Sequence, residues 1–525
     1  MSTQQVLIDG TWMASAGSQT FQAVNPRTGE TLPGIYPVSP WPEIERALQA
    51  AAAASRQMRD WPGERFAAFL EAYAAAIDAH AAELVAMAHA ETALAVEPRL
   101  AKGELPRTSN QLRQAAAAAR EGSWSQPILD TKANIRSMYG PIGPVCVFGP
   151  NNFPFAFNSI AGGDFAAAVA AGNPVIAKGH SSHPGTTRLF AELAQQAAQA
   201  TDMPAGFVQL IYRTAHEDGQ RLVSHPLLGA TGYTGARATG LVLKEAADRV
   251  GKPIYLELSS INPIFILPGA LVERAAAVTD EFVGSSLMGT GQFCTNPGLV
   301  LLLAGEETEV FIAGLQTRFE SAPVGTLLGA GVLSHLERGF ETLRKAGAKL
   351  LTGGEAGGGS GACFRNTLLR ISALQFLDAP EAMQTEVFGN CALLVVADSA
   401  EDLLKVAGAL EGNLTGTIYS ATDGGDDTLY SRIEPVLRQK VGRLLNDKMP
   451  TGVAVSPAMN HGGPFPATGH PVFTAVGIPA SLHRFSMLQC YDGVRPGRLP
   501  TALRDQNPNG QMWRNIDGVW TQDSL

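Results

Sequence analysis

Cys294 is the residue of this sequence best placed to act as a nucleophile. It follows a glycine-rich stretch at residues 289–292 and precedes an apolar, strand-like run, Leu299–Leu303. Glycines let a substrate approach the backbone closely, and a thiolate in such a setting can attack a carbonyl carbon. A cysteine beside an apolar run is more often inert packing, so both interpretations stay open on this segment alone.

Asn152 and Glu257 are polar side chains at places where apolar runs end. Asn152 lies in a strand-to-helix turn at residues 150–154. Its amide could donate a hydrogen bond to a developing oxyanion, or it could simply cap a helix. Glu257 lies between two leucines at the end of an apolar strand. There it would be a general base with a pKa raised by burial, or one half of a buried ion pair.

Three further segments contain residue types that hold a nucleotide cofactor. Lys178 ends an apolar strand and could donate to a ribose or a phosphate, or it could extend its stem toward solvent. Glu386 lies in a turn-like stretch at 385–389. Residues 234–240 open a helix after a strand, and a helix N-terminus binds phosphate. That stretch lacks the G-x-G-x-x-G pattern, so it is weak evidence by itself.

These residues belong to a region, beginning at Gly143, in which apolar strands alternate with helices. Strands are expected at 145–148, 175–178, 207–211, 231–233 and 254–258, and helices at 157–171, 185–200, 216–224 and 236–249. This alternation predicts an α/β fold with a doubly wound parallel sheet, which binds ligands at the carboxyl ends of its strands. The polar segments at 149–152, 178–181, 234–240 and 257–260 all fall at those ends.

Other elements flank this sheet on both sides of the sequence. Helices that begin near Ser39 and Gly63 have apolar residues at helical spacing and are expected to pack. A second α/β region begins near Asn262 and continues to about Pro464, with a glycine-rich surface loop at 353–361.

Composition narrows the classes of function. The 525 residues suggest two or three domains, and the net charge of −9 argues against nucleic acid as the main partner. The five cysteines are odd in number and widely spaced, so we expect neither a disulfide framework nor a metal site. The sequence has no signal peptide pattern and no apolar run that would span a bilayer. We therefore expect a cytoplasmic protein with no membrane partner.

The order of these motifs resembles the aldehyde dehydrogenase superfamily. The runs that carry the resemblance are FGPNNFPF at 148–155, AGNPVIAK at 171–178, YTG at 233–235, LEL at 256–258, GQFC at 291–294 and EVFG at 386–389. The resemblance implies a Rossmann-type cofactor domain at 1–127 and 141–261 and an α/β catalytic domain at 262–466. It also implies a small β extension for oligomerisation, together with the C-terminal tail, at 128–140 and 467–525. The chain would then form a homodimer or a homotetramer.

Within that superfamily the sequence is similar to the 2-oxoglutarate semialdehyde (2,5-dioxopentanoate) dehydrogenase branch. The runs that carry this closer similarity are AGGD at 161–164, KGH at 178–180, HPGT at 183–186, SINP at 260–263, residues 289–298, HGGPFP at 461–466 and LRDQNP at 503–508. It implies oxidation of a small-molecule aldehyde, 2-oxoglutarate semialdehyde, to 2-oxoglutarate. NADP-dependent dehydrogenases of medium or long-chain aliphatic aldehydes share some of these runs and are the alternative.

The resemblance also assigns roles to the candidate residues. Cys294 would attack the aldehyde, the Asn152 amide and the Cys294 N–H would bind the oxyanion, and Glu257 would activate the water that hydrolyses the thioester. Cofactor contacts would come from Lys178, Gly235, Glu386 and Phe388, which match the family's motifs. Two further residues would join them: Ser181, just after the strand that ends at Lys178, and Arg213, which follows a later strand and adds a positive charge. Many NAD-preferring members have a glutamate near Ser181, and a carboxylate there would repel a 2′-phosphate. We therefore expect NADP, with NAD as the alternative.

The sequence departs from the common family pattern at five positions: Asn151, Ala236, Ser259, Ser260 and Asn390. Three other functions are alternatives. Acyl transfer to coenzyme A would not need the base Glu257. A Cys/His hydrolase would need a histidine beside Cys294, and the spacing of His180, His183 and His461 places none there. A catalytically retired binding protein would not need the intact set of polar residues.

Overall fold

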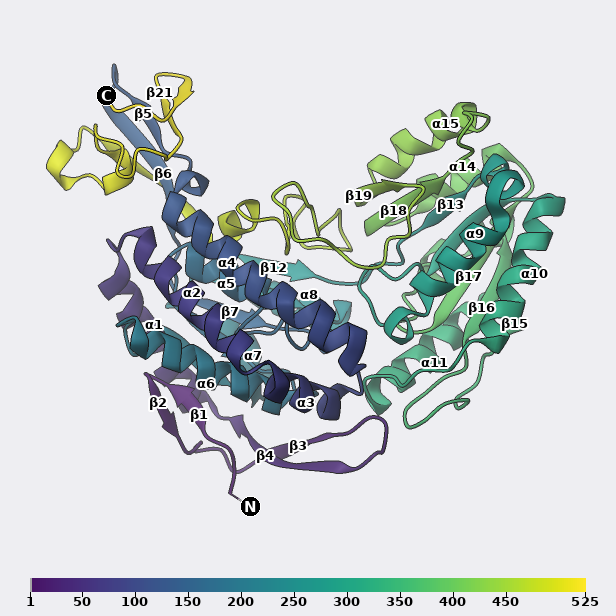
Figure 1. The fold of residues 1–525 in the computed structure, drawn as a ribbon, viewed down its shortest axis with the longest axis horizontal. Helices are drawn as coiled ribbons and strands as arrows, with labels where there is room; N and C mark the ends of the chain where they lie inside the picture. The colour runs from purple at the N-terminus through teal and green to yellow at the C-terminus, as the bar shows by residue number, and fades with distance from the viewer. Residues whose placement is uncertain (1) are drawn as a thin grey trace.

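A seven-stranded sheet forms the centre of the first lobe in this computed structural model, which describes residues 2–525 (Figure 1). Its strands, in spatial order, are β12 (Ile254–Glu257), β11 (Ala230–Thr234), β7 (Val145–Phe148), β8 (Val175–Lys178), β9 (Val208–Ile211), β1 (Val6–Ile8) and β2 (Thr11–Met13). The first five are parallel, which confirms the predicted α/β sheet. The antiparallel edge made by β1 and β2 was not predicted.

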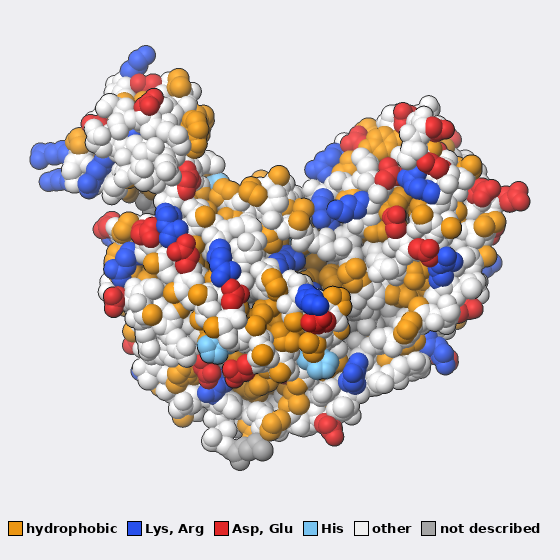
Figure 2. All heavy atoms as spheres, viewed as in Figure 1, with side chains coloured by type: hydrophobic (Ala, Val, Ile, Leu, Met, Phe, Trp, Pro, Cys, Tyr) orange, Lys and Arg blue, Asp and Glu red, His pale blue; other side chains and the backbone are white. Residues whose placement is uncertain are grey.

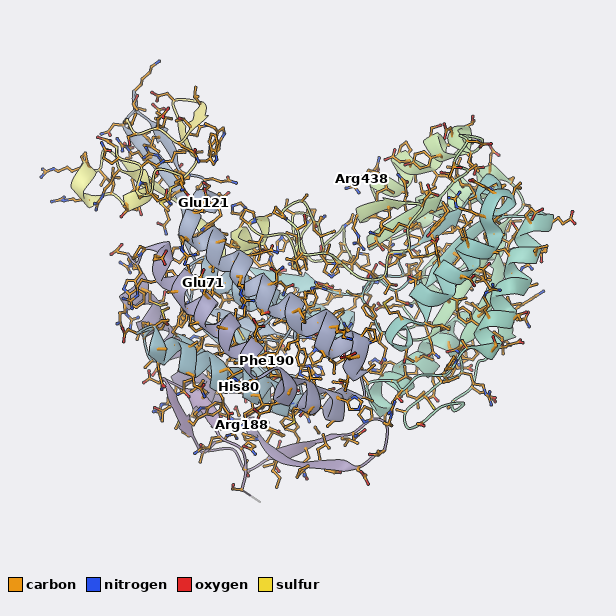
Figure 3. All side chains as sticks on the ribbon, in the orientation of Figure 1. Glu71, His80, Glu121, Arg188, Phe190 and Arg438 are labelled. Carbon is orange, nitrogen blue, oxygen red and sulfur yellow. The ribbon has the colours of Figure 1, made fainter. Side chains whose placement is uncertain are left out.

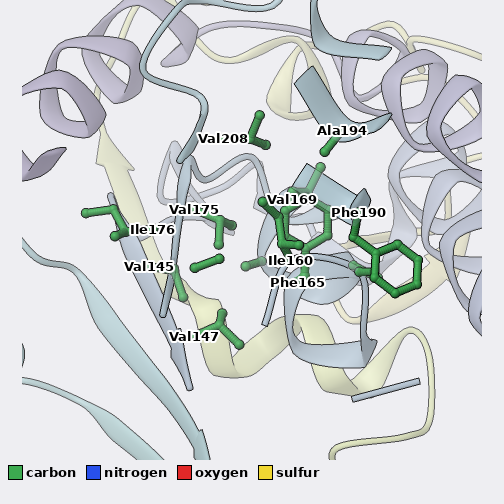
Figure 4. Packing of buried hydrophobic residues seen from close by; sticks show 14 of the residues in the cluster. Val145, Val147, Ile160, Phe165, Val169, Val175, Ile176, Phe190, Ala194 and Val208 are labelled. Atoms are coloured by element: carbon green, nitrogen blue, oxygen red, sulfur yellow. The ribbon is translucent and has the colours of Figure 1, made fainter. Parts of the chain in front are cut away.

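Apolar side chains between this sheet and its helices form the largest core of the molecule. Helices α5 (Gly163–Ala170) and α6 (Pro184–Ala200) pack against β7, β8 and β9, and α2 (Gly63–Ala79) packs against both helices. Figure 4 shows Val147 and Val175 from the strands beside Phe165 from α5 and Phe190 from α6. Both phenylalanines are fully buried, and burial of each such side chain contributes roughly 1.5–3 kcal/mol.

The remaining helices of this lobe are α1 (Trp41–Met58), α2 (Gly63–Ala79), α3 (Ala81–Thr92), α4 (Leu105–Glu121), α7 (His216–Val223) and α8 (Arg237–Asp248). A three-stranded sheet of β3 (Thr20–Val24), β4 (Thr31–Ser39) and β10 (Arg213–Thr214) lies below them in Figure 1. Phe190 and Arg188, both labelled in Figure 3, lie on α6. Phe190 is buried in the core, whereas the Arg188 guanidinium lies over the ring of Trp12 in β2.

The predicted helix at 157–171 was wrong at its first turns, because α5 begins only at Gly163. Residues 154–161 form turns instead. The Asn158 side chain donates to the carbonyl of Pro154 at 2.9 Å and accepts from the backbone N–H of Ile160 at 3.1 Å. Such local bonds compete with helical hydrogen bonding. The segment thereby forms a compact loop after β7 rather than an early helix.

The second lobe has its own seven-stranded sheet. Its order is β15 (Lys349–Thr352), β16 (Thr367–Ser372), β17 (Cys391–Ala397), β14 (Leu299–Leu303), β13 (Ile264–Ile266), β18 (Asn413–Tyr419) and β19 (Val441–Asn446). Its helices are α9 (Pro268–Ser286), α10 (Glu306–Ser321), α11 (Ala330–Lys345), α12 (Ala373–Asp378), α13 (Pro380–Met383), α14 (Ala400–Ala409) and α15 (Asp427–Arg438).

A fourth sheet, of five strands, projects from the first lobe (Figure 1). Its order is β20 (Ser486–Asp492), β6 (Ile135–Pro141), β5 (Ile128–Asp130), β21 (Arg514–Ile516) and β22 (Val519–Thr521). Residues 467–485, between the second lobe and β20, run beside β12. There the N–H of Leu258 donates to Ala467 at 2.8 Å, and the N–H of Gly469 donates to Leu256 at 3.0 Å. Within residues 2–525, no helix has the length and apolar character that crossing a membrane requires.

Candidate active site

Cys294 lies on a tight turn of the second lobe that meets the first lobe, since His461 links its thiol to Glu257. The space-filling view is hollowed between the two lobes (Figure 2). The preceding residues Gly289, Thr290 and Gly291 all have positive φ, at 56°, 59° and 68°. A Cβ on Gly291 would lie 2.1 Å from the carbonyl oxygen of Gly389, so only glycine fits there. In the structure Gly291 brings the cysteine turn against the backbone of Gly389, in the segment that follows Glu386, and the predicted close approach of a substrate stays a prediction.

The Cys294 thiol forms a cluster with a histidine and a glutamate. Sγ lies 3.4 Å from Nε2 of His461, and the same nitrogen lies 2.9 Å from Oε1 of Glu257. His461 and Glu257 are each 1% exposed. The expectation that no histidine lies beside Cys294 was therefore wrong. The three ligand-type atoms fall within 4.8 Å of one another, a spacing a divalent metal could also accept, so the absence of a metal site stays a prediction.

His461 was missed because its placement depends on a long-range chain path. It lies after the second lobe, on a segment that returns toward β12. Its backbone N–H donates to Thr474 Oγ1 at 3.0 Å, and its carbonyl accepts from Ala475 at 2.9 Å. No local periodicity reports such a return. The one signal in the sequence is the HGGPFP run at 461–466, which carries the resemblance to the semialdehyde dehydrogenase branch.

Burial and a neighbouring carboxylate both act on the Cys294 thiol. Burial raises its pKa well above the ordinary value, the negative charge of Glu257 raises it further, and the positive charge of Arg107 opposes both. The thiol is therefore mostly protonated at neutral pH, and it needs a base in contact to become a nucleophile. His461 Nε2 is at hydrogen-bonding distance for that role.

Asn152 lies beside the cysteine turn, as its candidate role requires. Its Nδ2 donates to the carbonyl of Gln292 at 3.1 Å, and its own carbonyl accepts from Arg99 at 2.8 Å. Gln292 is held in turn, because its Oε1 accepts from the N–H of Leu328 at 2.8 Å. The amide of Asn152 is thus anchored two residues from Cys294, where a substrate oxygen could compete for its second N–H.

An apolar cluster surrounds the thiol. Phe153, Phe157 and Phe293 are buried there, and Cys294 packs against the cluster. The ring centroids of Phe153 and Phe293 lie 5.3 Å apart, edge to face, and Phe157 lies 5.8 Å from the His461 ring. Such walls exclude water and suit the carbon chain of a small substrate.

Glu386 and Phe388 line one pocket together with Gly291 and Phe293. Burial raises the pKa of Glu386 to about 7, while the backbone N–H of Ser260, 3.4 Å from Oε1, acts in the opposite direction. These two predicted cofactor residues therefore adjoin the cysteine turn, on the side of the second lobe.

Lys178, Ser181 and Gly235 lie at or just after the carboxyl ends of β8 and β11. Lys178 Nζ lies 6.0 Å from the centroid of Phe148, and burial lowers the pKa of Lys178 to about 8. The N–H of Gly235 donates to the carbonyl of Glu257 at 3.1 Å. Arg213, in β10, is exposed and lines a separate cavity with Thr20. Ser181 lies in the turn between β8 and α6.

Comparison with known proteins agrees with this architecture. The model of the aldehyde dehydrogenase family matches residues 12–434. The chain is 39% identical to alpha-ketoglutaric semialdehyde dehydrogenase 2 of Azospirillum brasilense, over 94% of this chain and 95% of that protein. It is 33% identical to the alpha-ketoglutaric semialdehyde dehydrogenase of Acinetobacter baylyi, over 97% of each.

Solved structures give the same fold. A lactaldehyde dehydrogenase superposes with a TM-score of 0.79 at 21% identity, covering 93% of this chain and 98% of that one. A 3,6-anhydro-L-galactose dehydrogenase in complex with NAP superposes with a TM-score of 0.80 at 21% identity, covering 93% and 99%. The chain therefore belongs to the aldehyde dehydrogenase family and is an NAD(P)-dependent enzyme that oxidises an aldehyde.

Proposed function

We propose that this enzyme oxidises 2-oxoglutarate semialdehyde to 2-oxoglutarate, with NADP as the preferred cofactor. The observation that carries the chemistry is the contact of Cys294 Sγ with His461, which also holds Glu257. The two relatives at 39% and 33% identity, both named for the alpha-ketoglutaric semialdehyde, support the substrate. Oxidation of medium or long-chain aliphatic aldehydes is the alternative, and no relative described above is named for it.

Cys294 begins the reaction in this proposal. His461 Nε2 takes the thiol proton, and the sulfur attacks the aldehyde carbon to form a tetrahedral adduct. The Asn152 amide and the Cys294 N–H donate hydrogen bonds to the adduct's oxygen. A nicotinamide ring held beside the cysteine turn by Glu386 and Phe388 would supply the hydride acceptor that oxidation of this adduct to a thioester on Cys294 requires.

Glu257 completes the reaction. Its carboxylate takes a proton from water, which attacks the thioester and releases the acid with the Cys294 thiolate as leaving group. The carboxylate is buried and already hydrogen bonded through Oε1, whereas Oε2 has no partner among residues 2–525 and can accept from water. A positioned base of this kind favours hydrolysis over acyl transfer to coenzyme A.

The candidate cofactor residues fit a nicotinamide dinucleotide. Glu386 and Phe388 would hold the nicotinamide end beside the cysteine turn, and Gly235 would border the pyrophosphate. Lys178, Ser181 and Arg213 would hold the adenosine end, and the positive charge of Arg213 acts on Lys178. Two cations and a hydroxyl suit a 2′-phosphate, and no carboxylate is among the three. Solved relatives include one complex with NAP and one with NAD+.

The proposal also covers the organisation of the molecule. We assign the cofactor domain to 1–127 and 141–261, the catalytic domain to 262–466, and the oligomerisation extension and tail to 128–140 and 467–525. We further propose a cytoplasmic homodimer or homotetramer. Exposed apolar side chains on the extension, Leu488 and Trp520 among them, support an oligomer, and the free cysteines accord with a reducing compartment.

Initial-rate kinetics test the substrate and the cofactor together. We expect kcat/KM for 2-oxoglutarate semialdehyde to exceed that for hexanal and decanal by at least about 100-fold. We expect NADP to be preferred over NAD, and an Arg213→Ala variant to lose that preference. Equal or higher kcat/KM for decanal would favour the alternative substrate class. A preference for NAD in the unaltered enzyme would reject the cofactor assignment alone.

A further inference from the structure

We propose that the guanidinium of Arg107 binds the carboxylate of the oxo-acid aldehyde and so selects this substrate. The inference rests on the proposed function, since it names the group that recognises the far end of that substrate. Nothing in the sequence distinguished Arg107.

Arg107 lies on α4, and its guanidinium faces the apolar cluster around Cys294. Its guanidinium carbon is 5.3 Å from the ring centroid of Phe157 and 5.8 Å from that of Phe153. Those two rings belong to the same cluster that packs against the Cys294 thiol. The aromatic rings therefore connect the arginine to the nucleophile, and they would lie along the methylene groups of a short substrate chain.

The charge of Arg107 has no anionic partner among residues 2–525. Nε donates to Gln111 Oε1 at 3.3 Å, which is a neutral acceptor, and Nη2 is buried without any hydrogen bond. Burial lowers the pKa of Arg107, and the charges of Glu104 and Cys294 act against this. A buried cation without a partner is costly, and a substrate carboxylate would supply the missing partner with two parallel hydrogen bonds.

The carboxylate one turn before Arg107 is already occupied. Oε1 of Glu104 accepts from the N–H groups of Phe155 and Ala156 at 2.8 and 2.9 Å, and Oε2 pairs with Arg99 at 3.3 Å. Glu104 therefore fixes the loop after β7 and leaves Arg107 unpaired.

Two other arginines near the thiol are engaged elsewhere. Arg99 donates to the carbonyl of Asn152 and pairs with Glu104. Arg443 donates to the carbonyls of Pro450 and Gly452 at 2.8 and 3.2 Å. Both have a structural task in the free enzyme, which leaves Arg107 as the cation best suited to receive an anion.

The test compares Arg107→Gln and Arg107→Lys with Arg113→Gln. Arg113 is a matched control, because it lies on the same helix but is exposed and pairs with Asp78. The readout is the ratio of kcat/KM for 2-oxoglutarate semialdehyde to kcat/KM for pentanal, a neutral aldehyde of equal carbon number. We expect this ratio to fall about 100-fold in Arg107→Gln, mainly through KM, because one partner of a desolvated charge pair is lost.

The lysine variant keeps the charge but loses the two-pronged geometry, so its ratio should lie between those of the other two enzymes. Arg113→Gln should keep the ratio of the unaltered enzyme. Competitive inhibition of pentanal oxidation by 2-oxoglutarate supplies a second readout. The inhibition constant of 2-oxoglutarate should rise about 100-fold in Arg107→Gln and less in Arg107→Lys. The lysine variant still tests the role of Arg107 if the glutamine variant folds poorly.

Two outcomes would overturn the inference, and they differ. If the unaltered enzyme prefers the oxo acid but the Arg107 variants keep the ratio, or lose both substrates in parallel, Arg107 only packs and the proposed function still stands. If the unaltered enzyme does not prefer 2-oxoglutarate semialdehyde over pentanal, the proposed substrate fails, and the role of Arg107 fails with it.

Discussion

His461 Nε2 lies between a thiol and a carboxylate, and it can carry only one proton. In the resting enzyme it can accept from the Cys294 thiol or donate to Glu257. Once it takes the thiol proton, the imidazolium stands beside both a thiolate and a carboxylate, and its charge stabilises both. The reactive form of Cys294 thus depends on His461.

Alkylation of Cys294 in the free enzyme should therefore depend steeply on pH. Because burial and Glu257 raise the thiol pKa, we expect the iodoacetamide rate to rise about tenfold per unit between about pH 6 and pH 9. His461→Ala should slow the reaction at least about tenfold at fixed pH. The exposed Cys490 is an internal control that should react alike in both enzymes. A flat profile would mean a permanent thiolate and would contradict this description.

Glu257→Gln should separate the two halves of the reaction. The substitution removes the base for thioester hydrolysis but leaves the thiol, so acylation of Cys294 should be faster than hydrolysis of the thioester. We expect steady-state turnover to fall about 10²–10⁴-fold, with an initial burst of about one NADPH per active site. Rapid mixing measures the burst, and intact-protein mass spectrometry should detect the acyl group on Cys294. Unchanged turnover, or slow turnover without a burst or an adduct, would remove this role from Glu257.

Local signals at strand ends were enough to single out Cys294, Glu257 and Asn152, and the structure brings these three segments together. The same signals could not find His461 or Arg107. His461 reaches the thiol because the chain returns from the second lobe, and Arg107 approaches it because α4 packs on the loop after β7. Neither of these long-range contacts produces a periodic pattern in the sequence.

At the scale of elements, alternation of apolar strands and helices predicted the parallel strands within one or two residues. The predicted start of α5 was wrong for a local reason, because the Asn158 side chain bonds the backbone and stabilises a turn. The preference of asparagine for turns is a signal that the sequence contains. The cap of α6 was beyond prediction. Its N-cap residue His183 makes no capping bond, and Glu91 from α3 binds its first turn instead.

Loss of Glu91 should destabilise the first lobe. Its oxygens accept from the N–H of Gly185 at 2.7 Å and from the N–H and hydroxyl of Thr186 at 2.9 and 2.8 Å. Glu91→Ala would leave these donors buried and unpaired, so the free energy of unfolding should fall by about 3 kcal/mol. Glu192→Ala, which breaks a pair with Arg188 on the same helix, should cost less than about 0.5 kcal/mol. Urea unfolding measures both changes. Equal losses of unfolding free energy in the two variants would show that Glu91 does not cap α6.

At the scale of the whole molecule, the active site exists only because two lobes meet. The first lobe supplies Glu257 and Asn152, the second supplies Cys294 and Glu386, and the returning segment supplies His461. The sequence indicated both α/β regions, but not the angle between them or the course of residues 467–485, because such contacts join positions hundreds of residues apart.

The projecting sheet should hold copies of the chain together. Strand β20 is an edge strand, and Leu488 and Val519 on this sheet are 60% and 65% exposed. Such an apolar edge favours pairing with another copy. We expect sedimentation velocity to show an oligomer that Leu488→Glu weakens. Val272 lies on α9 and is 71% exposed, so Val272→Glu is a control that should leave the oligomer intact. A monomeric unaltered enzyme, or equal dissociation by the control, would contradict this arrangement.

The most direct test of the whole account is the rate of NADPH formation from 2-oxoglutarate semialdehyde by Cys294→Ser and Cys294→Ala, with circular dichroism to establish that both variants are folded. Because no other described side chain is placed to form the thioester, we expect both to fall at least about 10³-fold below the unaltered enzyme. Folded variants that oxidise the aldehyde at the original rate would contradict the account.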